Sequence, residues 1–364
     1  MKKNDSKNPL RVLYLFAGQR KKVEEDFNRG LMPDSFLIGF NHFKNFGIDA
    51  TYIENKFLNY IRKKNYNLTN LFLIPFLGRY DIVFSGASLS LPFLAKCILR
   101  FKKPKFIWYN TFFTNIIKRN QNKPIRLWAV RKTIASLDAI FCPSSAQRQF
   151  LIEQGFDANK IFFIPNGIDV EFMQRKKEEQ KDIPRNVEPF ILSVGKDMGR
   201  DYVTLAEAVR GLSIQVKVAA LPRNFSDVKE IPSNLHILGF VPFGDLIKLY
   251  NQAEFVVIPT KSEKHTDASD CSGQYVLLDA MSLGKTVLAS RRETLADYLS
   301  NGVDGVIVEP ENSIALREAI VGLINDPERA RLMGDRAGKR AEAHFTTKCL
   351  AENLVDIFKK VLAK

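Results

Sequence analysis

Cysteine and histidine are scarce in this chain, and neither type is clustered. The four cysteines stand far apart, at Cys97, Cys142, Cys271 and Cys349. This spacing argues against a disulfide framework and against a zinc site, and it is typical of proteins kept in a reducing compartment. The four histidines also lack metal-ligand spacing, standing at His42, His236, His265 and His344. We therefore expect no metal cofactor.

Long apolar runs are also missing. No window holds 18 uncharged apolar residues, and the best candidate, Leu71–Leu77, is far too short for a membrane span. The basic N-terminus leads into no apolar core of the secretory kind. We therefore expect a cytoplasmic protein without a signal peptide.

Positive charge is confined to the first half. Residues 1–170 hold 27 Lys+Arg and 12 Asp+Glu, whereas the remainder holds 27 and 28. Such a basic half indicates an acidic partner, which could be lipid headgroups, a lipid-diphosphate acceptor or nucleic acid, although a merely Lys-rich surface is the alternative. For reversible binding to an anionic membrane, the candidate cations are Arg62–Lys64, Lys102, Lys103 and Lys105, with apolar contact from Leu94 and Arg100–Phe101.

The pattern of apolar runs predicts an α/β protein of two domains. Six short apolar strands alternate with helical segments up to residue 164, and a second such series starts at Pro189. This alternation predicts two parallel sheets, each covered on both faces. The charged stretch 171–188 reads as a linker between domains 1–170 and 189–346. The apolar stripe of 347–364 predicts a last helix that returns to the first domain.

The stretch from Ser269 to Ser290 carries the strongest chemical signal. Small polar residues lead into a helical segment that ends at Gly284, and a β-branched run follows. A helix start of this kind leaves backbone N–H groups free for an anion, so Ser272, Gly273 and Gln274 could donate to phosphate or sugar. Asp279, further along the helix, could accept hydrogen bonds from sugar hydroxyls.

A second cluster of candidates follows a strand of the same domain. Lys196 and Arg200 flank a glycine turn at the strand's carboxyl end, where open α/β sheets bind ligands. Two cations there could hold a diphosphate and stabilise it as it leaves. Gly18, in the turn after the first strand, lacks a Cβ and would let the first domain approach the phosphates closely.

The sequence resembles the family-4 glycosyltransferases. Residues 277–287, Leu-Leu-Asp-Ala-Met-Ser-Leu-Gly-Lys-Thr-Val, are similar to the second half of that family's donor-site motif, and the likeness extends over roughly residues 135–345. The resemblance implies the GT-B architecture, two Rossmann-like doubly wound domains that face each other across a cleft. It also implies a retaining transferase that moves a sugar from a nucleotide-diphosphate sugar to a glycan or lipid-linked glycan, without a metal, in cell-surface polysaccharide or glycolipid synthesis. The expected partners are the nucleotide sugar, the acceptor and an anionic membrane surface, with no nucleic acid.

The chain departs from the family at one important position. The family's first glutamate falls on Cys271, and Asp270 lies beside it. Either Asp270 supplies the missing carboxylate to the donor sugar, as a catalytic residue beside Lys196 and Arg200, or that role is absent. A catalytically inactive sugar-nucleotide-binding or scaffold protein, or an epimerase or hydrolase on the same fold, therefore remains an alternative.

Overall fold

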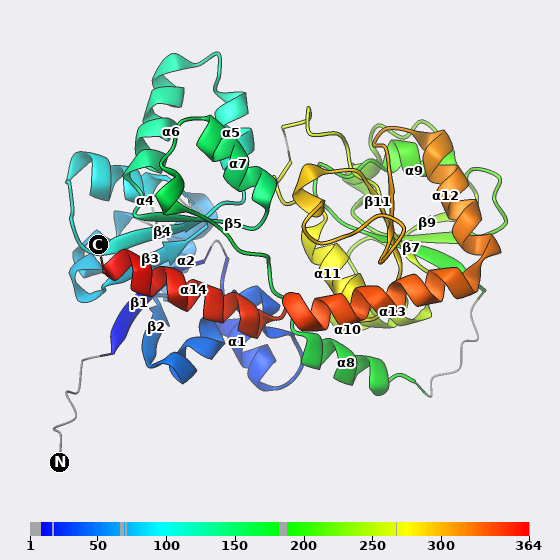
Figure 1. Ribbon diagram of the computed structural model, residues 1–364, viewed down its shortest axis with the longest axis horizontal. Coiled ribbons are helices and arrows are strands. Elements are labelled where there is room, and N and C mark those ends of the chain that lie inside the picture. Colours follow the sequence, from blue (N-terminus) through cyan, green and yellow to red (C-terminus); the bar gives the residue numbers. More distant parts are fainter. Residues whose placement is uncertain are drawn as a thin grey trace.

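Two six-stranded parallel sheets form the framework of the computed structural model (Figure 1). It describes residues 9–363 except 17, 66–68, 70, 87, 182–187 and 267. The first sheet has the order β2-β1-β3-β4-β5-β6 and the second β12-β11-β10-β7-β8-β9. In each sheet the chain first builds outward on one side of β1 or β7 and then returns to add strands on the other side, as in doubly wound folds, so the predicted fold class is confirmed.

The first sheet and its helices come from residues 10–163. Its strands are β1 (Leu10–Leu15), β2 (Ile48–Tyr52), β3 (Ile82–Ser85), β4 (Lys105–Tyr109), β5 (Ala139–Cys142) and β6 (Ile161–Phe163). Its helices are α1 (Lys21–Asn28), α2 (Lys56–Lys64), α4 (Ser90–Pro92), α5 (Phe113–Arg119), α6 (Pro124–Ser136) and α7 (Ser145–Glu153). Short 3-10 or π turns are η1 (Asp34–Leu37), η2 (Phe40–Phe46), η3 (Ile74–Arg79), η4 (Phe93–Ile98) and η5 (Ala158–Lys160).

The second sheet follows the same plan. Its strands are β7 (Phe190–Val194), β8 (Gln215–Ala219), β9 (Leu235–Ile237), β10 (Val256–Ile258), β11 (Val287–Ser290) and β12 (Val306–Val308). The helical segments are α8 (Val170–Glu178), α9 (Tyr202–Val209), α10 (Phe243–Gln252), α11 (Gln274–Ser282), α12 (Ser313–Asn325), α13 (Pro327–His344) and α14 (Thr347–Leu362), with short turns η6 (Pro222–Phe225) and η7 (Glu293–Leu295). Apolar clusters cover both faces of each sheet, which explains why the central strands are buried throughout.

The predicted linker is in part a helix. α8 occupies the first half of 171–188, and its Phe172 and Met173 are buried in the core of the second domain. Asp169 caps this helix by accepting a hydrogen bond from the Phe172 N–H at 3.0 Å. Two apolar side chains among charged neighbours are enough to hold one face of a short helix, but they are too few to show a period in the sequence.

The chain passes between the domains twice, and the two passages lie side by side. The Ile168 N–H donates to Phe345 O at 2.7 Å, and the Thr347 N–H donates to Ile168 O at 3.1 Å. A Cβ on Gly167 would lie 2.8 Å from the Thr346 oxygen, so only glycine fits there. After the second passage, α14 runs back along the first domain, where its apolar face packs on the first sheet (Figure 1).

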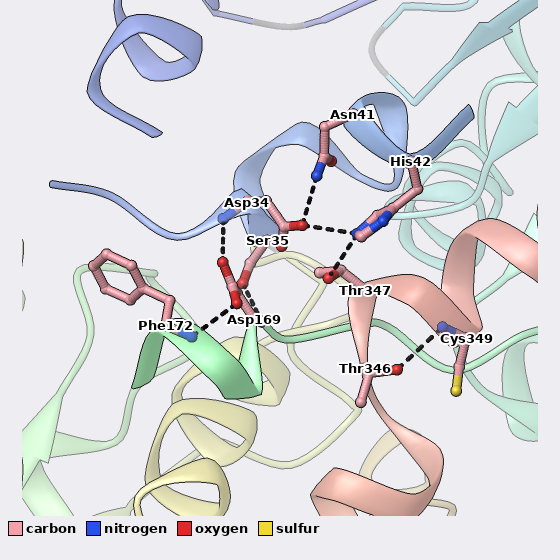
Figure 2. Close-up of polar contacts among 9 residues, drawn as sticks. All are labelled: Asp34, Ser35, Asn41, His42, Asp169, Phe172, Thr346, Thr347 and Cys349. Atoms are coloured by element: carbon pink, nitrogen blue, oxygen red, sulfur yellow. Dashed lines mark hydrogen bonds and ion pairs between the residues drawn. The ribbon is translucent and has the colours of Figure 1, made fainter. Parts of the chain in front are cut away.

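Residues of the first domain form hydrogen bonds with both of these passages. Asp34 N–H donates to Asp169 Oδ2 at 3.0 Å, while the His42 Nε2 lies 2.8 Å from Asp34 Oδ2 and 3.2 Å from Thr347 Oγ1 (Figure 2). Asp169 and Thr347 belong to the two passages, so one cluster holds both. We infer that this cluster sets how the two domains meet.

Within the described residues, none of the helices is both long and apolar enough to cross a membrane. The same residues contain no group of three His, Cys, Asp or Glu side chains placed to hold a metal ion.

Candidate active site

The turn after β7 is held in shape by one carboxylate. Asp197 Oδ1 accepts the N–H of Gly199 at 2.9 Å, and its Oδ2 accepts the N–H of Ser269 at 3.4 Å. This ties the turn to the loop that precedes α11, so Lys196 and Arg200 belong to the same edge of the sheet as the start of α11. Lys196 is exposed and Arg200 is buried.

The Arg200 guanidinium lies between two glycines. A Cβ on Gly195 would lie 2.1 Å from Arg200 Nε, and one on Gly273 would lie 3.2 Å from Nη1. Gly195 and Gly273 also have positive φ values, 149° and 95°. Glycine is therefore required at both positions by the backbone conformation and by the space that the arginine occupies.

This guanidinium is buried and forms no ion pair among the described residues, although the charge of nearby Asp197 acts on it. Its Nε and Nη1 have no hydrogen-bond partner in that part of the chain, and the residue is 5% exposed. Burial lowers the pKa of Arg200 because the charged form loses hydration. An unpaired buried charge is costly, and such a group is typical of a site built to receive an anion.

The start of α11 differs from the prediction in detail. The Ser272 N–H already donates to Ser269 O, and the Gln274 N–H donates to Cys271 O, each at 3.2 Å. Two of the three expected backbone donors are thus engaged within the turn itself. The Gln274 side chain is engaged as well, since it accepts from Asn166 Nδ2 and donates to Thr294 O, both at 2.8 Å. Gln274 therefore joins the domains, while Gly273 lies against Arg200.

Asp279 on α11 lies close enough to Tyr250 on α10 for its charge to act on the tyrosine. Burial raises the pKa of Asp279 to about 7. Tyr250 on α10 is fully buried, and its hydroxyl has no hydrogen-bond partner among the described residues. Burial, and then the charge of Asp279, raise the pKa of Tyr250, whereas the charge of Arg200 lowers it. Tyr250 is therefore within electrostatic reach of both Asp279 and Arg200.

Asp270 has a different environment from the one expected. Its Oδ2 accepts the Thr114 N–H at 3.0 Å and its Oδ1 accepts the Asn115 N–H at 3.1 Å, in the first turn of α5. Both oxygens are thus bonded to backbone N–H groups of the first domain. Burial raises the pKa of Asp270 to about 6 in spite of these two bonds.

Cys271 does not supply a carboxylate in its place. The thiol is buried between Gln147 Nε2, at 3.6 Å, and the Asn110 oxygen, at 3.9 Å. Burial raises its pKa well above the ordinary value, so it stays protonated. The family's first acidic position is therefore occupied by an uncharged contact between the domains.

Gly18 lies in the first domain, in a turn near α11. It directly precedes Gln19 and Arg20, and a Cβ on Gly18 would come within 3.3 Å of Arg20 Nη1. The Arg20 guanidinium stacks over the Phe16 ring at 4.8 Å. Its positive charge also lowers the pKa of Tyr275 on α11, although burial is the larger effect and raises that pKa to about 12. The Gly18 turn thus faces α11 from the opposite domain.

Two residues of this region were missed in the sequence. Tyr250 has the helical spacing of a core residue, so nothing in its pattern marks the hydroxyl. Arg292 follows β11, is 6% exposed, and has a buried Nε without a partner in the described chain. Its position directly after a strand, the same signal that marked Arg200, could have identified it.

Comparison with known proteins identifies a family. Residues 46–172 match the family model described as Glycosyltransferase Family 4, and residues 207–326 match Glycosyl transferases group 1. An uncharacterized glycosyltransferase of Methanocaldococcus jannaschii is 23% identical over 58% of this chain and 57% of its own length. The alpha-maltose-1-phosphate synthase of Mycobacterium tuberculosis is 24% identical over 66% of this chain and 67% of its own. The chain thus spans roughly half to two thirds of these curated relatives.

Solved structures show the same fold. Sucrose-phosphate synthase of Thermosynechococcus elongatus has a TM-score of 0.74 at 17% identity, covering 98% of this chain and 99% of its own. Anabaena HepE in complex with UDP has a TM-score of 0.65 at 14% identity, covering 96% and 100%. Both family models and the fold lead to one conclusion: this chain is a glycosyltransferase of the family-4-like type with the GT-B fold.

Proposed function

We propose that this glycosyltransferase is a retaining enzyme that moves a sugar from a nucleotide-diphosphate sugar to a hydroxyl of a glycan or lipid-linked glycan. The observation that carries the proposal is the buried, unpaired Arg200 guanidinium beside the start of α11. A diphosphate supplies the negative charge that this position lacks. HepE structures that contain UDP or UDP-glucose share the fold, which supports a nucleotide sugar as donor.

In this proposal the two cations act on the leaving group. When the bond from the anomeric carbon to the diphosphate oxygen breaks, negative charge grows on the diphosphate. Arg200, fixed by the two glycines, and Lys196, exposed at the same turn, stabilise that charge. Since two side chains supply positive charge here, we propose that the enzyme needs no metal cofactor.

The acceptor is activated by the donor itself. As the acceptor oxygen bonds to the anomeric carbon, its proton passes to an oxygen of the departing diphosphate, so no protein base is needed. Asp270 gives no support for a protein nucleophile because both its oxygens are occupied by α5. This route retains the anomeric configuration.

Asp279 serves the nucleotide in the same scheme. Its carboxylate accepts hydrogen bonds from the ribose hydroxyls, as the resemblance of its motif to the family implies. Gly18 lets the first domain close over the phosphates. The enzyme works at the inner face of the cell membrane, as a peripheral protein, in the synthesis of a cell-surface polysaccharide or glycolipid.

One observation favours a second candidate. Cys271 replaces the family's first acid, and Asp270 is bonded to the first domain instead. A protein that binds a nucleotide sugar without transferring it would show the same arrangement.

A panel of nucleotide sugars separates the two candidates. The protein is incubated with UDP-, GDP- and ADP-sugars, thermal stability is recorded for each, and release of nucleoside diphosphate is followed. A ligand that binds only the folded state raises the melting temperature. Thermal stabilisation with slow release of nucleoside diphosphate supports the transferase. Stabilisation without any release, even when an acceptor is added, supports the binding protein. If no nucleotide sugar of the panel stabilises the protein, both candidates are contradicted.

A further inference from the structure

The helical layer on one face of the first sheet holds almost all of the chain's excess positive charge. Residues 55–137 contain sixteen Lys and Arg and a single acidic residue, Asp81. The helices and turns of this stretch bury their inner side chains in one apolar cluster against that face of the sheet, including Leu58, Leu77, Ala95 and Ile134. Their remaining side chains form the outer surface of a single layer, which we call the basic layer.

Large apolar side chains are exposed on the same layer. They are Phe57 (58% exposed), Tyr60 (58%), Phe72 (47%), Ile98 (56%), Leu99 (46%), Ile125 (82%) and Trp128 (57%). Phe57 and Phe72 contact each other, with ring centroids 5.5 Å apart, and η4 packs against α6, so the exposed groups are neighbours rather than scattered. Exposed apolar groups gathered in this way mark a binding surface.

Cations and rings are paired across the basic layer. Lys64 lies 4.8 Å from the Tyr60 ring centroid, Arg79 lies 5.4 Å from Phe76, and Lys132 lies 4.7 Å from Trp128. Further exposed cations of the layer include Arg100, Lys102, Lys103, Lys123 and Arg126. A surface of this composition suits a partner that is anionic outside and apolar beneath.

The residues exposed on the basic layer differ in part from the membrane-binding residues expected from the sequence. Lys105 forms an ion pair with Asp138 at 3.3 Å, and Phe101 packs on the core cluster, so neither is free to bind a membrane. Ile98 and Leu99 take the place expected for Phe101. Lys64 lies on the layer, whereas the side chains of Arg62 and Lys63 fall outside the described residues.

We propose that the basic layer docks on an anionic lipid bilayer, with its rings and aliphatic groups entering the interface and its cations facing the headgroups. Nucleic acid is the other polyanion to consider. The most exposed apolar side chain of the layer, Ile125, is aliphatic, and so are the exposed Ile98 and Leu99. Burying such side chains in a bilayer interface stabilises binding, whereas contact with a phosphate backbone contributes little. This inference rests on the proposed function in one respect, namely that the acceptor lies at the membrane.

The two tryptophans allow a direct test. The chain has two, of which Trp108 in β4 is 1% exposed and Trp128 in α6 is 57% exposed. The full chain is mixed at low salt with vesicles of phosphatidylglycerol and phosphatidylcholine, or of phosphatidylcholine alone. We expect binding to the anionic vesicles only, with a blue shift of tryptophan emission and quenching by brominated lipid. Trp128→Phe should still bind and should lose the shift.

Charge variants test the electrostatic part. Lys102→Glu with Arg126→Glu should weaken vesicle affinity by roughly a hundredfold or more, since each cation near the surface contributes about a fivefold factor. The matched control is Arg336→Glu with Lys339→Glu, two exposed cations of α13, which should bind like the wild type. Ile125→Ser should also weaken binding, whereas Ile314→Ser, at an isoleucine on α12 that is 70% exposed, should not.

Three outcomes would overturn the proposal. They are absence of binding to anionic vesicles at low salt, vesicle binding with unchanged Trp128 emission, and competition by an RNA oligonucleotide with loss of vesicle binding. No donor or acceptor is present in these mixtures, so failure here leaves the transferase assay unaffected.

Discussion

At the scale of single residues, the site depends on charges that the fold has removed from water. Arg200 is buried with two guanidinium nitrogens unpaired in the described chain, and burial raises the pKa of Asp279 on α11 to about 7. Burial and the charge of Asp279 raise the pKa of Tyr250, whereas the charge of Arg200 lowers it.

The pKa of Asp279 predicts a pH dependence of donor binding. Only the ionised carboxylate accepts both ribose hydrogen bonds, and burial raises its pKa to about 7. Affinity for a nucleotide sugar should therefore fall as the pH is lowered from 8 to 6, by roughly tenfold. Calorimetry with UDP-glucose is suitable because its diphosphate, esterified at both ends, does not titrate in that range. Asp279→Asn should bind weakly with no such dependence; an unchanged slope in this variant would remove Asp279 from the site.

At the scale of elements, glycines join the β7 turn to α11. Gly195 and Gly273 enclose the Arg200 guanidinium, and Gly273 is the first residue before α11, with φ at 95°. The same elements were predictable from the sequence, because the strands are apolar runs bounded by turns and the helix ends at Gly284. The position of Arg200 between them was not, since it depends on how two distant turns pack.

Gly273→Ala is the corresponding test. The new Cβ would lie 3.1 Å from Ile258 Cγ2 and 3.2 Å from Arg200 Nη1, in a backbone conformation that costs an alanine about 1 kcal/mol. We expect stability to fall by about 1–2 kcal/mol and donor affinity to fall with it. Gly302→Ala is the control, because Gly302 has φ at 77° and nothing within 4 Å of its Cβ. It should lose stability and keep donor affinity; equal affinity loss in both variants would contradict the role given to Gly273.

At the scale of the whole molecule, the loop before α11 is bonded to the first domain. Asp270 caps α5, Asn115 Nδ2 donates to Ala268 O at 2.8 Å, and Ser269 Oγ donates to Thr111 O at 3.2 Å. The sequence could not show this, because Asp270 and its partners are separated by about 155 residues. An acid beside a family motif predicts a sugar contact, whereas the bonds of Asp270 to α5 depend on tertiary packing that the motif does not encode.

Asp270 should make stability depend on pH through this contact. Its pKa is about 6 in the folded chain and 3.8 as the ordinary value, so the folded state holds the proton more tightly. The contribution of Asp270 to the free energy of unfolding is therefore fully present below pH 4 and is lost as the pH rises through 6. The free energy of unfolding should change by about 3 kcal/mol over this range on account of Asp270. Chemical unfolding of the wild type and of Asp270→Asn at pH 4, 5, 6 and 7 measures it. The gap between the two proteins should change across this range; parallel curves would show that Asp270 does not titrate there.

The most direct test of the account concerns Arg200, because an unpaired buried cation is the feature on which the proposed function depends. Arg200→Met removes a charge that is costly to bury, so the free protein should be at least as stable as the wild type. The same change should lower turnover of the nucleotide sugar by roughly a hundredfold or more. Thermal melting and diphosphate release are measured on the two proteins side by side. Stability kept with turnover lost is the predicted result, and a destabilised variant that still turns over its donor would contradict the account.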